Sequence, residues 1–232
     1  MSTIADNLSS VIARIGAATQ AAGRAPGSVN LLAVSKTKPA QAVREAHAAG
    51  QRHFGENYLQ EALAKQAELA DLDLTWHFIG PIQSNKTKAI AEHFDWVHSV
   101  DRLKVAQRLA EQRPAHLPPL NVCLQVNISG EASKAGCEPA ELAALAAAVG
   151  ALPGLCLRGL MAIPEPGMSI DEQNVTFARV RALRDGLDGA LDSLSMGMSD
   201  DLEAAISQGA TWVRIGTALF GARDYSKPEP TA

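Results

Sequence analysis

At 232 residues and a net charge of −4, the chain has the length of one α/β domain and lacks the concentrated basic face that a nucleic-acid partner requires. Apolar residues make up 47% of the sequence and aromatic residues only 4%, so the expected core is large and aliphatic. Residues 1–7 lack the features of a signal peptide, no apolar run approaches the ~18 residues that span a bilayer, and three cysteines without CxxC spacing favour a reducing, cytoplasmic setting.

The chain opens with an amphipathic helix and then alternates between strands and helices. Ile4, Leu8, Val11 and Ile15 recur at helical spacing, and the turn signal at 25–27 ends this segment. Apolar, β-branched runs then mark eight predicted strands at 29–35, 52–55, 75–80, 96–100, 121–128, 156–163, 193–196 and 211–216. Helical patterns separate these runs, most clearly at 139–149, with Pro139 in the first turn, and at 171–188.

Strands that alternate with helices predict parallel βαβ units, and eight such units close into a TIM-type (β/α)8 barrel. We therefore expect an α/β fold with one barrel domain over residues 1–232 and a frayed tail at about 225–232. An extra N-terminal helix is expected to cover the side where the eighth strand has no full helix after it. The alternative is an open doubly wound sheet, which usually has a GxGxxG turn after its first strand, whereas this chain has SKTKP at 35–39.

Polar residues recur where the predicted strands end, which is the active face of such barrels. One of them, Lys36, shares a face with Leu32 and Val34 on a two-residue period. Partial desolvation there would lower the pKa of the Lys36 amine and free it for attack on an aldehyde. The alternative is that Lys36 only extends out of the barrel mouth. Lys38 is its rival, but it stands before Pro39 and is expected to face solvent.

The segments after the seventh and eighth strands are typical of phosphate sites in barrels, which use backbone N–H groups and helix N-termini. Gly216 permits close approach of the backbone to a ligand, and Ser199 and Thr217 supply hydroxyl donors. The alternative is that Asp200 and Glu203 form a capping box that only starts a helix.

Arg214 alternates with Val213 and Ile215, so it is expected to face the barrel interior, where it needs an acceptor. Two acceptors stay open: a ring nitrogen of a ligand, or a carboxylate in an interior salt bridge. His77 is expected to orient a ligand or to be a core histidine, and Asn57 to line the pocket or to cap a helix. The six histidines show no HExxH or Cys/His cluster, so no metal is predicted.

Six segments carry a distinctive pattern: LAVSKTKP at 32–39, FGENY at 54–58, WHFIGPIQSNK at 76–86, GLMAIP at 159–164, LSMGMSDD at 194–201 and RIGTALFG at 214–221. Together they resemble the YggS/PROSC pyridoxal phosphate homeostasis proteins, over residues 4–224. The resemblance implies a fold similar to the N-terminal barrel of alanine racemase and pyridoxal 5′-phosphate (PLP) as cofactor. It implies these cofactor-binding residues: Lys36 as the Schiff-base lysine, Ser199, Gly216 and Thr217 on the phosphate, Arg214 near the pyridine nitrogen, and Asn57, His77 and Met161 lining the pocket.

By this resemblance the chain buffers or delivers PLP and maintains vitamin B6 homeostasis, as a monomer in transient contact with recipient enzymes, and is not itself an enzyme. Arg214, a permanent cation, would keep a neighbouring pyridine nitrogen unprotonated and weaken the cofactor as an electron sink. One alternative is a PLP-dependent racemase or decarboxylase of the alanine racemase-like fold. Racemases of that fold also use a tyrosine from a second β domain, and Tyr58 and Tyr225 lie in no comparable motif. The other alternative is a barrel enzyme for a phosphorylated metabolite.

Overall fold

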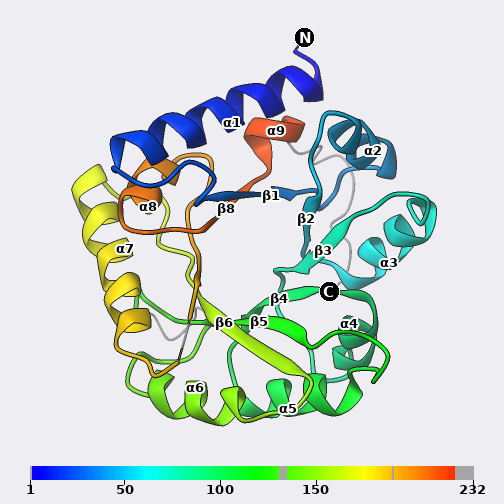
Figure 1. Cartoon of the computed structure of the whole chain (residues 1–232), viewed down its shortest axis with the longest axis vertical. Coiled ribbons are helices and arrows are strands. Elements are labelled where there is room, and N and C mark those ends of the chain that lie inside the picture. Colours follow the sequence, from blue (N-terminus) through cyan, green and yellow to red (C-terminus); the bar gives the residue numbers. More distant parts are fainter. Residues whose placement is uncertain (1, 131–134, 190, 223–232) are drawn as a thin grey trace.

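The computed structural model describes residues 2–130, 135–189 and 191–222, and its strands form one closed parallel barrel (Figure 1). The strands follow one another in chain order, and β8 pairs with β1 to close the barrel. Their bounds are β1 Asn30–Val34, β2 His53–Glu56, β3 Thr75–Phe78, β4 Trp96–Val100, β5 Leu120–Gln125, β6 Leu155–Met161, β7 Ser193–Ser195 and β8 Trp212–Ile215. All eight predicted strands and the predicted barrel are confirmed. The predicted frayed tail at 225–232 lies outside the described residues.

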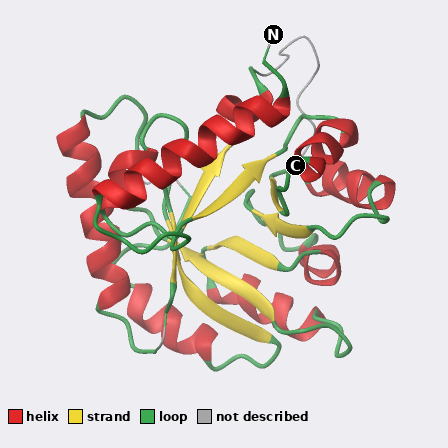
Figure 2. Ribbon diagram, turned by 45° about the horizontal axis from the view of Figure 1, so that its top comes forward, coloured by secondary structure: helices red, strands yellow, loops and turns green. Residues whose placement is uncertain are grey.

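Helices surround the barrel on its outside (Figure 2). Their bounds are α1 Ile4–Ala21, α2 Ala40–Ala48, α3 Leu59–Glu68, α4 Thr87–His93, α5 Leu103–Gln112, α6 Leu142–Gly150, α7 Ile170–Asp185, α8 Leu202–Ser207 and α9 Thr217–Phe220. The prediction that Pro139 occupies the first turn of a helix is wrong. Pro139 lies in the turn before α6, where its carbonyl accepts from the N–H of Leu142 (3.4 Å). Helix α7 begins at a capping box formed by Ser169 and Glu172, one residue before its predicted start.

Helix α1 takes the place of a long helix after β8. The helix that follows β8, α9, is a single turn, and α1 lies beside it on the outside of β8 and β1 (Figure 1). The apolar face of α1 buries Leu8, Val11 and Ile15, and the Asn7 side chain donates to the carbonyl of Leu219 in α9 (3.0 Å). The expected covering role of the N-terminal helix is therefore confirmed. Among the described helices, none is both long enough and apolar enough to cross a membrane.

Apolar side chains fill the interior of the barrel as well as the layer between strands and helices. The interior cluster consists of Leu32, Trp96, Cys123, Met161 and Trp212, each at most 8% exposed. Inward-pointing residues of successive strands stack in such layers in TIM-type barrels. The middle of the barrel is thus a packed core, which places ligand space above it, at the carboxyl ends of the strands.

Candidate functional site

A cavity of about 660 Å³ opens at the carboxyl ends of the strands. Its walls come from the segments that end or follow β1, β2, β3, β6, β7 and β8, and from Arg14 of α1. Six of the eight residues predicted to bind a cofactor line it: Lys36, Asn57, Ser199, Arg214, Gly216 and Thr217. Because β8 closes the barrel against β1, residues from both ends of the sequence meet at this one site.

The charged residues that line the cavity are mostly cations. Arg14, Lys36, Lys38 and Arg214 are the basic residues of the described lining, and Asp200 is the acidic one. A concave surface lined by one sign of charge concentrates its field on a ligand of the opposite sign. The cavity therefore fits an anionic ligand.

Lys36 lies two residues after the end of strand β1, at the start of the loop before α2. Leu32 belongs to the interior cluster and Val34 lines the cavity, so the alternation of the strand brings Lys36 to the inner rim, where it is half-buried. Ser35 points to the other side of the strand end, and its hydroxyl donates to the carboxylate of Glu56 (2.6 Å). The alternation read from the sequence thus brings the Lys36 amine to the cavity.

Lys38 corrects one expectation. The residue lines the cavity and is not fully exposed, and its Nζ donates to the carbonyls of Gly221 (3.1 Å) and Ala222 (2.8 Å). Pro39 starts α2 as its N-cap residue, so the loop turns back toward the rim before the helix begins. Lys38 thereby ties the segment after α9 to the mouth of the cavity.

The loop after β7 presents Ser199 to the cavity. Gly197 makes this loop possible, because its φ is +93° and a Cβ there would lie 2.6 Å from the Cβ of Ala205 in α8. The alternative capping box of Asp200 and Glu203 does not form: Asp201 is the N-cap residue of α8, and its carboxylate accepts from the N–H of Met198 (2.5 Å).

Arg14 of helix α1 reaches the same loop, and sequence reasoning missed it. Its Nη2 donates to the carbonyl of Ser199 (3.1 Å), and its Nε donates to the carboxylate of Glu203 (3.0 Å). The amphipathic pattern of α1 shows which residues are buried, but not that α1 packs across α8 with Arg14 at the cavity. With Ser199, Gly216 and Thr217, Arg14 makes one wall of hydroxyl, backbone and guanidinium donors.

Arg214 is buried at the floor of the cavity with neutral acceptors. Its Nη1 donates to Ser195 Oγ and its Nη2 to the carbonyl of Ala162, both at 2.9 Å. Within the described residues no carboxylate forms an ion pair with it, so the salt-bridge alternative does not hold there. Burial lowers the pKa of Arg214 to about 10, which still leaves it a cation at neutral pH. Its remaining N–H groups are suited to a ligand acceptor.

A chain of three histidines runs from Arg214 into the barrel. Ser195 Oγ lies 2.7 Å from His98 Nδ1, His98 Nε2 lies 2.9 Å from His77 Nδ1, and His77 Nε2 lies 3.1 Å from His53 Nδ1. Because Arg214 can only donate to Ser195 Oγ, the Ser195 proton is available to His98 Nδ1, and when Ser195 donates there each neutral imidazole donates from Nε2 to the next. Burial lowers the pKa of all three, that of His98 to about 3.

His77 and Met161 correct the predicted pocket lining. Neither is among the described residues that line the cavity. His77 is fully buried in β3 within the histidine chain, and Met161, at the end of β6, belongs to the interior cluster. Both sit one layer below the rim, where inward side chains fill the barrel. His77 is therefore the core histidine of the two alternatives.

Asn57 follows β2 and lines the cavity with an unused acceptor. It does not cap α3, whose N-cap residue is Tyr58 with no side-chain bond. The backbone of Asn57 is pressed against Gly80, where a Cβ would lie 2.1 Å from the Asn57 carbonyl oxygen. Its Oδ1 is buried and has no hydrogen-bond partner in the described structure. A buried orphan acceptor beside a cavity fits a ligand that donates a hydrogen bond.

Comparison with known proteins places this site in a family. Residues 7–224 match the family described as alanine racemase, N-terminal domain. The chain is 75% identical over 228 residues to the pyridoxal phosphate homeostasis protein of Pseudomonas aeruginosa, covering 98% of this chain and 99% of that one. It is 56% identical to the protein of the same name from Escherichia coli, covering 98% and 100%.

Solved structures support the same family and fold. The structure of PipY from Synechococcus elongatus with PLP bound is 45% identical with a TM-score of 0.82, and the match covers 94% of this chain and 100% of that one. Alanine racemase from Corynebacterium glutamicum shares the fold, with a TM-score of 0.66 at 19% identity, over 96% of this chain and 64% of that one. The chain therefore belongs to the alanine racemase N-terminal domain family and, within it, to the pyridoxal phosphate homeostasis proteins.

Proposed function

We propose that the chain binds PLP as a Schiff base on Lys36 and holds it reversibly, so that it buffers or delivers the cofactor and maintains vitamin B6 homeostasis. The observation that carries this proposal is that Lys36 and three further cationic residues, Arg14, Lys38 and Arg214, line a single cavity. PLP is an aldehyde with an anionic phosphate, so an amine and a cationic wall match its two functional ends. The relatives named for PLP homeostasis and the PLP-bound PipY structure support the same ligand.

The lining residues divide between the parts of the cofactor. We assign the phosphate to Ser199, Gly216 and Thr217, on the side of the cavity that Arg14 also reaches, and we call these four residues the phosphate wall. Arg214 is assigned to the pyridine nitrogen, because it is a buried donor whose protein partners are neutral oxygens. We assign the orphan acceptor of Asn57 to a donor group of the ligand.

We propose binding rather than turnover because of Arg214. PLP, when bound, supplies an electron sink whose strength depends on a protonated pyridine nitrogen. A guanidinium at that nitrogen donates a hydrogen bond and gives up no proton, so it opposes ring protonation. We place this role in the cytoplasm, and the three cysteines, all free, suit its reducing conditions. Recipient PLP enzymes are the proposed partners.

The purified protein should bind PLP far more tightly than pyridoxal, which has the aldehyde but no phosphate. Equilibrium dialysis of both ligands measures this, and we expect a loss of roughly 100-fold or more, about 2.7 kcal/mol, for the ligand without phosphate. Equal binding of the two ligands would contradict the assignment of the phosphate to Ser199, Gly216 and Thr217.

Deuterium exchange at Cα across a panel of amino acids tests the alternative of a racemase or decarboxylase. Exchange at a typical enzyme rate of ~10 s⁻¹ would overturn the binding role.

Arg214→Glu should let the pyridine nitrogen of bound PLP hold a proton. A carboxylate at this position would raise the pKa of the ring nitrogen by at least about one unit, or ~1.4 kcal/mol, because opposite charges favour the protonated form. A pH titration of the cofactor absorbance measures the change. Arg214→Gln is the matched control, since it removes the cation without adding a carboxylate. If the spectra of wild type and Arg214→Glu change identically with pH, Arg214 is not the neighbour of that nitrogen.

A further inference from the structure

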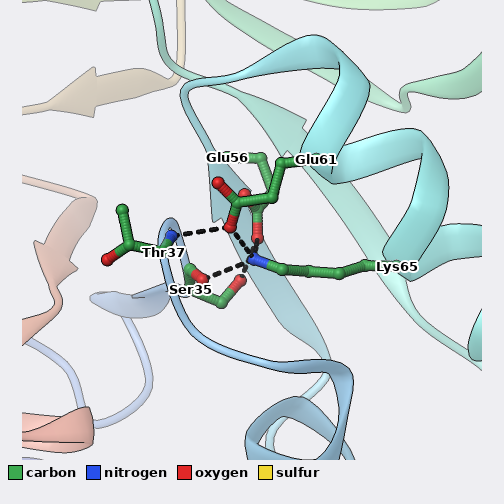
Figure 3. Close-up of polar contacts among 5 residues, drawn as sticks. All are labelled: Ser35, Thr37, Glu56, Glu61 and Lys65. Carbon is green, nitrogen blue, oxygen red and sulfur yellow. Dashed lines mark hydrogen bonds and ion pairs between the residues drawn. The ribbon is translucent and has the colours of Figure 1, made fainter. Parts of the chain in front are cut away.

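A buried ionic cluster contacts Ser35 and Thr37, the residues on either side of Lys36 (Figure 3). We call it the Lys65 cluster; it consists of Lys65 and Glu61 from α3 and Glu56 from β2. The Lys65 residue is 4% exposed and Glu56 is fully buried. None of the three is among the described residues that line the cavity, so the assignments above leave the cluster without a role.

All three N–H groups of the Lys65 ammonium have acceptors. Nζ donates to Glu56 Oε1 (2.8 Å), to Glu61 Oε1 (2.5 Å) and to the carbonyl of Ser35 (2.6 Å). An ammonium has three donors and no acceptor, so these contacts use its full capacity. Two of the three go to carboxylates on different elements, and the third goes to the backbone next to Lys36. Lys65 thus joins α3 and β2 to the end of β1.

The carboxylates of the cluster hold both neighbours of Lys36. The Ser35 hydroxyl donates to Glu56 Oε1 (2.6 Å), and the N–H of Thr37 donates to Glu61 Oε1 (2.6 Å). With the Lys65 bond to the Ser35 carbonyl, three hydrogen bonds anchor the residues before and after Lys36, as Figure 3 shows. These bonds leave the Lys36 side chain itself directed to the other face of the strand end.

The backbone of Thr37 adopts a conformation that a threonine does not favour. Its φ is +64°, and among the described residues it is the one non-glycine residue in the left-handed region. A β-branched residue rarely adopts this conformation, and such outliers persist where the surroundings over-determine them. The bond from Thr37 N–H to Glu61 supplies that constraint, immediately after Lys36.

Burial of these charged groups costs free energy, so stabilisation of the fold alone does not account for the cluster. It buries two carboxylates with one ammonium, and Glu56 Oε2 and Glu61 Oε2 have no hydrogen-bond partner in the described structure. Burial raises the pKa of Glu56, which shows how poorly this site tolerates its charge. Buried ion pairs often stabilise a fold no better than apolar residues of similar volume. Positioning is a role that apolar residues could not perform here, because they offer no bonds to Ser35 or Thr37.

We propose that Lys65, Glu56 and Glu61 are positioning residues for Lys36: they fix the backbone on both sides of it, so that its amine is presented to the cavity in the orientation needed for covalent capture of the ligand aldehyde. This inference rests on the proposed function of Lys36. Amine and aldehyde condense with loss of one water, and the amine nitrogen must approach the carbonyl carbon along a defined direction. The residues assigned to the phosphate come from the segments after β7 and β8 and from α1, and none of them takes part in the hydrogen bonds of the cluster.

The test compares two ligands that differ at one group. PLP has an aldehyde, whereas pyridoxine 5′-phosphate has an alcohol there and cannot form the covalent link. In Lys65→Met we expect the rate of PLP capture, followed by absorbance after mixing, to fall by roughly 10- to 100-fold, the range that small misplacements of reacting groups cost. The affinity for pyridoxine 5′-phosphate should stay within about twofold of wild type. Lys88→Met, on the exposed face of α4, is the matched control and should change neither value.

Glu61→Gln is the second variant, and it decides the matter if Lys65→Met does not fold. It keeps the size of the side chain and removes the charge that binds Lys65 and Thr37, so capture should slow in the same direction. Glu68→Gln, exposed on the same helix, is its control. Unchanged capture in the cluster variants overturns the inference, and so does an equal loss of both ligands, because the cluster would then support the cavity as a whole. Failure of the wild type to capture PLP would refute the proposed function itself.

Discussion

Lys36→Ala is expected to abolish covalent retention of PLP while leaving a weaker, reversible complex. The variant removes the rim amine, but the phosphate wall and Arg214 stay in place. We therefore expect the visible absorbance band of the Schiff base to disappear, and the affinity measured by dialysis to fall by roughly 10- to 100-fold, or about 1.4 to 2.7 kcal/mol. Absorbance spectra and dialysis of the same samples measure the two effects separately.

Lys38→Ala is the matched control for this prediction. Lys38 lines the same cavity two residues away, but its Nζ bonds to the carbonyls of Gly221 and Ala222. Its removal should leave the absorbance band intact. The division of roles is wrong if Lys36→Ala keeps the band, or if it loses binding of every phosphate ligand.

Mild acid is expected to destabilise the fold through the buried histidine chain. His77 and His98 are fully buried, and burial lowers their pKa, whereas the unfolded chain takes up protons near pH 6.5. The unfolded state thus binds more protons below that pH, so the stabilisation is complete above pH 6.5 and is lost as the pH falls toward the folded-state value, about 3 for His98. At pH 5 the loss relative to pH 7.5 is about 2 kcal/mol for His98, and His77 contributes a loss of the same sign.

Urea denaturation at pH 7.5 and pH 5 measures this loss. His98→Gln removes one of the two titrating groups, so the difference in unfolding free energy between the two pH values should shrink by about 2 kcal/mol. His116→Gln, at an exposed position, is the control and should leave the difference unchanged. An unaltered pH dependence in His98→Gln would contradict the assignment of a buried neutral histidine.

The barrel was predictable because each strand carries its own local signal. Strands buried on both faces read as short apolar runs, and parallel topology follows once helices separate them. The position of Lys36 was also local, because strand alternation places it on the same side as Leu32 and Val34. The helix start at Pro139 failed for a local reason: proline suits the first turn of a helix and the turn before it equally.

The rest of the site depends on tertiary packing that one sequence does not display. Glu61 and Lys65 are spaced as an ordinary surface ion pair of a helix, and their burial follows from tertiary contacts with Glu56 of β2 and with the residues after β1. Arg14 reaches the cavity because α1 crosses α8. His53, His77 and His98 lie on three consecutive strands, and their connection appears only when the barrel closes around them.

Borohydride reduction of the PLP-loaded protein, followed by peptide mapping, tests the central claim most directly. Reduction fixes the cofactor permanently to the nitrogen that holds it, and mass analysis of the peptides then identifies the residue. We predict one modified peptide, with the reduced cofactor on Lys36. Modification of Lys38 or any other lysine in its place, or no modification at all, would contradict the account.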